Sequence, residues 1–149
     1  MNSDIKLRLV KRMENFATPE AAEQFRKQAA EAASKTLLRD DTIGLVFLGG
    51  EYRHADHAMT LDCAIVNKYA FQINGVMMNL NAQLKSSKKT NIHLEVLPDD
   101  MGVLGKNEGV VLRLNVKFDG FESDEDFQVN PRDITLTINA VQYSRADGK

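Results

Sequence analysis

The sequence predicts an α+β fold in which two N-terminal helices precede an antiparallel sheet of about six strands. Helix-forming residues dominate the chain before residue 40, and strand patterns with alternating apolar and polar residues dominate after it. No helical pattern separates the strands, so the βαβ units of a parallel sheet are not expected. The sheet could be a sandwich or barrel-like, and an OB-like barrel with a helical extension is the alternative architecture.

The two predicted helices rest on different evidence. Residues 4–16 carry apolar side chains at helical spacing, namely Ile5, Leu9, Met13 and Phe16. The second helix is predicted from Pro19 to about Leu38, because Thr18 can cap it and Pro19 suits its first position. Its apolar stripe consists mainly of alanines, so this helix cannot anchor a large core alone.

The strands are predicted from period-two alternation and from compact apolar runs. They fall at residues 42–48, 60–67, 68–73, 76–84, 91–97, 109–118 and 134–140, where the second and third together could form one strand. Gly49–Gly50 is expected to end the first strand. Asn74–Gly75 is expected to form a hairpin turn, because both residue types tolerate positive φ.

Length and composition indicate one domain over residues 1–149, with a helical segment at 1–39 and a β body at 40–149. Cys63 is the only cysteine, so no intramolecular disulfide can form, and a lone thiol fits a reducing compartment. The apolar runs are too short to span a bilayer. We therefore expect a cytoplasmic protein.

A few polar residues bear on metal binding and catalysis. His54, His57 and Cys63 are zinc-ligand types, but their spacing matches no standard zinc framework. No activated nucleophile, converging carboxylate pair or phosphate-binding glycine loop is evident. We predict that the protein is not an enzyme and needs no cofactor, and a metal site near His54 and His57 is an alternative.

Protein–protein contact is the function that requires the fewest specific residues in the sequence. Met77 and Met78 are consecutive on a predicted strand, so their side chains point to opposite faces. Val111 and Val141 lie on otherwise polar strand faces, which either the helices or another chain must cover. The leading hypothesis is a small non-enzymatic interaction or assembly protein that binds itself or another protein as a homo-oligomer.

Single-stranded nucleic acid is the alternative partner. Tyr69 lies on a predicted strand and could stack on a base, as could Phe71 and Tyr143. Basic residues that could contact phosphates are Lys68, Lys85, Lys88, Lys89, Arg113 and Lys117. The formal net charge of −2 makes this partner less favoured, because phosphate contacts need a basic surface.

Overall fold

The computed structural model describes residues 5–10, 18–36, 38–55, 58–84, 89–116, 125–130 and 133–146. Within these residues the chain forms eight strands and two helices. In order they are β1 (Lys6–Leu9), α1 (Pro19–Lys35), β2 (Ile43–Arg53), β3 (Ala58–Asn67), β4 (Ile73–Leu84), β5 (Thr90–Val96), α2 (Pro98–Met101), β6 (Glu108–Val116), β7 (Phe127–Val129) and β8 (Ile134–Arg145).

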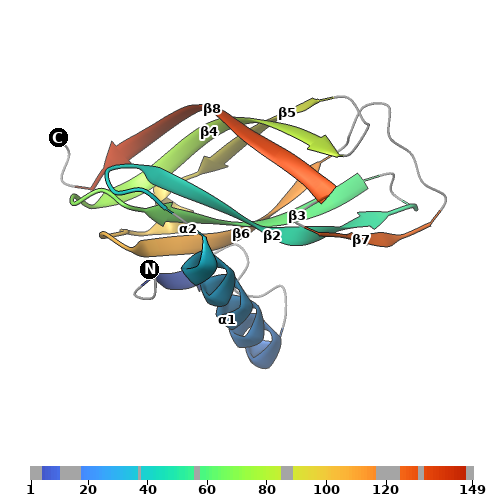
Figure 1. Ribbon diagram of the computed structural model, residues 1–149. Coiled ribbons are helices and arrows are strands. Elements are labelled where there is room, and N and C mark those ends of the chain that lie inside the picture. Colours follow the sequence, from blue (N-terminus) through green and yellow to red (C-terminus); the bar gives the residue numbers. More distant parts are fainter. Residues whose placement is uncertain are drawn as a thin grey trace.

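The strands form two sheets that lie one above the other (Figure 1). The five-stranded sheet has the order β1-β6-β3-β2-β7, and the three-stranded sheet has the order β5-β4-β8. Every named strand pair is antiparallel except β1 with β6, which run parallel. The predicted α+β class with antiparallel sheets is therefore confirmed. Both sheets are open, so the prediction of a closed OB-like barrel is wrong.

Two apolar clusters stabilise this arrangement. The larger one lies between the sheets and includes Met78 and Leu80 from β4 and Leu112 from β6. The smaller one lies between α1 and the outer face of the five-stranded sheet, where Ala29 and Ala33 of the helix share a buried cluster with strand side chains. Figure 1 shows α1 beneath the five-stranded sheet, on the side away from the three-stranded sheet.

The start of α1 is as predicted. The Oγ1 atom of Thr18 accepts a hydrogen bond from the backbone N–H of Ala21 at 3.2 Å, and Pro19 opens the helix. The helix ends at Lys35, slightly before the predicted end. No helix in the described ranges is long and apolar enough to cross a membrane.

The predicted helix at residues 4–16 is wrong in its first part, because residues 6–9 form β1, and only one long helix precedes β2. Ile5 and Leu7 are buried, whereas Lys6 and Arg8 are exposed, which is the period-two pattern of a strand. A short apolar segment is compatible with both the helical period and the strand period. Parallel pairing with β6 stabilises the strand here. Residues 11–16 lie outside the described residues.

Both predicted glycine turns are also wrong, because each dipeptide lies inside a strand. Gly49–Gly50 sits within β2 at an irregularity in its pairing with β3, and Gly49 has a φ of 135°. Asn74–Gly75 sits within β4, where a Cβ atom on Gly75 would lie 2.8 Å from Ser144 Oγ. The close approach of another strand, and not a hairpin, explains that glycine. The turn between β3 and β4 lies at residues 68–72 instead.

Candidate interaction surface

β8 is a long strand at the edge of the three-stranded sheet. Eleven of its twelve residues pair with β4, from Ile134 beside Leu84 to Arg145 beside Ile73. In the part of the chain that the structure describes, no strand pairs with its other edge. The free edge therefore presents backbone N–H and C=O groups that could pair with a further strand.

The inner face of β8 is only partly covered. Ile138 and Tyr143 point to the same side of the sheet as the buried β4 residues that they oppose, yet each is 40% exposed. On β5, the other edge of the same sheet, the inward-facing Leu94 and Val96 are each 1% exposed. The five-stranded sheet thus covers the β5 edge and leaves apolar side chains of the β8 edge open.

β8 also lacks the residue types that usually protect an exposed edge. Edge strands commonly carry charged residues or proline, which prevent pairing with other chains. Residues 134–144 contain none of these residue types. Charge is confined to the two ends, with Asp133 before the strand and Arg145 as its last residue.

A β-bulge in the middle of β8 changes which residues face inward. Leu80 opposes Ile138, but Asn79 opposes Ala140, so Asn139 is an extra residue. Inward-facing residues are consequently even-numbered up to Ile138 and odd-numbered from Val141 onward. Both halves of the strand keep apolar residues on the inner face.

An aromatic group holds the C-terminal half of β8 against the β3–β4 turn. The ring centroid of Tyr69 lies 4.6 Å from that of Phe71 and 5.0 Å from that of Tyr143. The guanidinium carbon of Arg145 lies 4.1 Å from the centroid of Phe71. Burial, followed by the proximity of Tyr143, raises the pKa of the Tyr69 hydroxyl. These contacts fix the position of Tyr143 and Arg145 at the end of β8.

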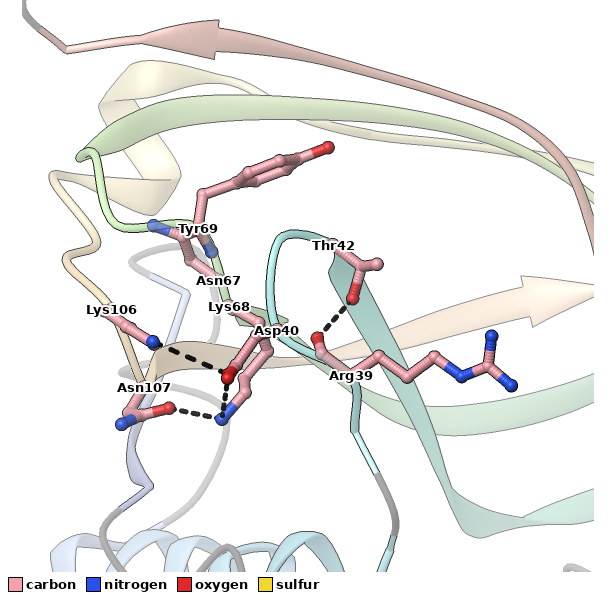
Figure 2. A network of polar contacts seen from close by, with 8 residues as sticks. All are labelled: Arg39, Asp40, Thr42, Asn67, Lys68, Tyr69, Lys106 and Asn107. Atoms are coloured by element: carbon pink, nitrogen blue, oxygen red, sulfur yellow. Dashed lines mark hydrogen bonds and ion pairs between the residues drawn. The ribbon is translucent and has the colours of Figure 1, made fainter.

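The β3–β4 turn that carries Tyr69 is itself fixed by a polar network (Figure 2). Lys68 is only 6% exposed, and its Nζ atom donates a hydrogen bond to Asn107 Oδ1 at 2.6 Å. The same Nζ atom lies 3.7 Å from Asp40 Oδ1, which is also 3.5 Å from Lys106 Nζ. The turn therefore joins the starts of β2 and β6, and Lys68 is engaged within the protein.

The four residues proposed for partner contact lie in different places. Met78 is 1% exposed between the sheets, and Val111 is fully buried in the cluster that α1 covers. Val141 is half-buried on the inner face of β8. Met77 lies on the outer face of the three-stranded sheet, beside Leu97 in a hollow of about 230 Å³. Val141 therefore belongs to the exposed edge, whereas Met78 and Val111 belong to the interior.

The basic residues proposed for nucleic acid are not brought together where the structure describes them. Arg113 lies on the helix-covered face of the five-stranded sheet, where its Nε atom donates to Asp62 Oδ1 at 2.7 Å. That hydrogen bond raises the pKa of the Arg113 guanidinium. Lys68 is buried in the polar network, and Lys89 is exposed next to β5. Lys85, Lys88 and Lys117 lie outside the described residues.

The described residues among those proposed for metal binding lie in different environments, one exposed and one buried. The backbone N–H of His54 donates to Asp126 Oδ1 at 2.7 Å in an exposed turn. Cys63 is fully buried, and burial, with a contribution from Asp62, raises the pKa of its thiol to about 12. His57 lies outside the described residues. Among those that are described, no three His, Cys, Asp or Glu side chains are grouped to hold a metal ion.

Comparison with known proteins found no match to a family model, to a curated protein or to a solved structure. The geometry of β8 is therefore the feature from which a function is inferred. The sequence pattern predicts Val141 but not Ile138 as a contact residue, and it indicates Tyr143 only as a residue that could stack on a base. The absence of charge and proline over residues 134–144 is the sequence feature that could have identified this edge.

Proposed function

We propose that the protein is a non-enzymatic assembly protein whose copies associate through the free edge of β8. The observation that carries this proposal is the contrast between the two edges of the three-stranded sheet. Inward-facing residues at the β5 edge are buried, whereas Ile138 and Tyr143 at the β8 edge are 40% exposed.

Addition of a partner strand would have two stabilising effects at this edge. A partner strand would pair with the free backbone groups of β8, and its side chains would cover Ile138 and Tyr143. Removal of apolar surface from water contributes about 25 cal/mol per Å² before the entropic cost of association. Because residues 134–144 carry no charge, no like-charge repulsion opposes the approach of an identical strand.

The test is the mass of the full-length protein, measured by light scattering during size-exclusion chromatography over a range of concentrations. We expect a dimer for the natural chain. Ile138→Lys places a charge on the edge and should shift the equilibrium to monomer, because pairing would then bury an ammonium group. Val103→Lys is the matched control: Val103 is 46% exposed, lies between α2 and β6, and should leave the mass unchanged.

Circular dichroism of both variants should match the natural chain, because each substitution replaces a side chain that is already exposed. A natural chain that stays monomeric at every concentration would overturn the proposal. So would an Ile138→Lys variant that keeps the mass and concentration dependence of the natural chain, because association would then use another surface.

A further inference from the structure

We infer that the partner strand is β8 of a second copy, paired antiparallel about a two-fold axis between Asn139 and Ala140. This inference rests on the proposed function and specifies its geometry. It joins two three-stranded sheets, each ending in β8, into one continuous six-stranded sheet.

The bulge determines the register. Residues that oppose each other in an antiparallel pair share a face, so an inward-facing residue must oppose an inward-facing residue. The inner face switches from even to odd numbers across the bulge, between Ile138 and Val141. Antiparallel self-pairing centred on the bulge therefore places the inner residues of one half opposite those of the other half.

The side chains match in this register. On the inner face, Ile138 opposes Val141 of the second copy, and Leu136 opposes Tyr143. On the outer face, Thr137 opposes Gln142, and Thr135 opposes Ser144. In these four pairs each apolar residue meets an apolar one and each polar residue a polar one. Cross-strand pairs of these kinds stabilise sheet pairing.

Neighbouring registers match less well. A shift by two residues in one direction places the apolar Ile138 opposite Asn139, the extra residue of the bulge. The same shift in the other direction places the inward-facing Val141 opposite the outward-facing Ala140. Only the register centred between Asn139 and Ala140 keeps both faces consistent along the whole strand.

The charges at the strand ends fit an antiparallel pair as well. Asp133 precedes the strand and Arg145 ends it, so antiparallel pairing brings the acidic end of one copy to the basic end of the other. Parallel pairing would place like charges together. A two-fold contact uses the same surface on both copies, so it closes as a dimer and does not continue into a fibre.

Cysteine pairing tests this register in the full-length chain. Thr137 and Gln142 are exposed and oppose each other between copies in the inferred dimer. In Thr137→Cys alone, or Gln142→Cys alone, the two cysteines lie five residues apart along the paired strands, about 17 Å, which is too far for a disulfide. When the two variants are mixed and oxidised, we expect a disulfide-linked band of twice the chain mass, absent from either variant alone.

Thr135→Cys mixed with Gln142→Cys is the register control, because these positions are two residues out of alignment and should give no linked band. The natural Cys63 is fully buried and should not compete. A dimer that links Thr135→Cys with Gln142→Cys, or that gives no linked band in either mixture, overturns the inferred register and leaves the proposed assembly function standing. A monomeric natural chain overturns both.

Discussion

At the scale of single residues, Asn67 makes three side-chain hydrogen bonds from a fully buried position. It is fully buried at the end of β3, and its Nδ2 atom donates to the carbonyl oxygens of Phe71 at 2.9 Å and Leu104 at 3.0 Å. Its Oδ1 atom accepts from the backbone N–H of Tyr69 at 2.9 Å. One amide therefore closes the β3–β4 turn and connects it to the segment before β6.

Replacing Asn67 by Ala should lower the free energy of unfolding by about 1–3 kcal/mol for each backbone group left buried without a partner. Denaturant unfolding measures this loss. Asn115→Ala, at an exposed position of β6, is the control and should change stability little. Equal stability of the two variants would show that the Asn67 hydrogen bonds do not stabilise the turn.

The contacts of Asn67 also explain why the sequence predicts the turn before β4 at the wrong position. Asn74–Gly75 has the better local turn chemistry, yet it lies inside β4. The chain turns at residues 68–72, where the partners of Asn67 include Leu104, thirty-seven residues further along the sequence. Because that partner is remote, no local pattern around Asn67 could identify the turn.

At the scale of elements, α1 docks through very small side chains. Ala29 is 1% exposed and Ala33 is fully buried against the five-stranded sheet. The outer face of that sheet carries apolar residues such as Val46, Val66 and Val111 in the same cluster. Close approach of the helix to the sheet therefore depends on alanine at these two positions.

Ala33→Leu should destabilise the protein by about 1–3 kcal/mol, because the added methyl groups have no space between helix and sheet. Ala21→Leu, at an exposed position of the same helix, is the matched control with similar helix propensity. Thermal unfolding of both variants gives the comparison. If Ala33→Leu unfolds at the same temperature as Ala21→Leu, the helix is not packed against the sheet as described.

The elements with strong local sequence patterns can be predicted from the sequence. The elements that depend on pairing with segments far along the chain cannot. Thr18 and Pro19 locate the start of α1, and the alternation from Val110 to Val116 identifies β6. β7 has only three residues, too few for a recognisable period. The lack of charge over residues 134–144 is visible in the sequence, but the exposure of Ile138 is not, because it depends on how far the opposite sheet extends.

At the scale of the whole molecule, the distribution of charge does not favour binding of nucleic acid by the described basic residues. The formal net charge is −2. Lys68 and Arg113, two of the residues proposed to contact phosphates, are engaged with Asp40 and Asp62, respectively. A phosphate would have to displace an acidic partner from each of them.

A titration of labelled single-stranded oligonucleotides by fluorescence anisotropy should accordingly show no saturable binding at about 50 mM salt, where phosphate contacts are strong. The natural chain is the sample, and Arg113→Gln is the comparison. Binding that weakens as salt rises, and that Arg113→Gln reduces, would instead favour the nucleic-acid alternative over an assembly role.

The parallel pairing of β1 with β6 has a consequence for synthesis of the chain. Leu7 lies beside Gly109, and Leu9 beside Val111, so among the described strands β1 has no partner until the ribosome has made β6. Ile5, Leu7 and the alanines of α1 share one cluster with Val111. β1 and α1, although made before β6, therefore reach their final position only after β6 has emerged.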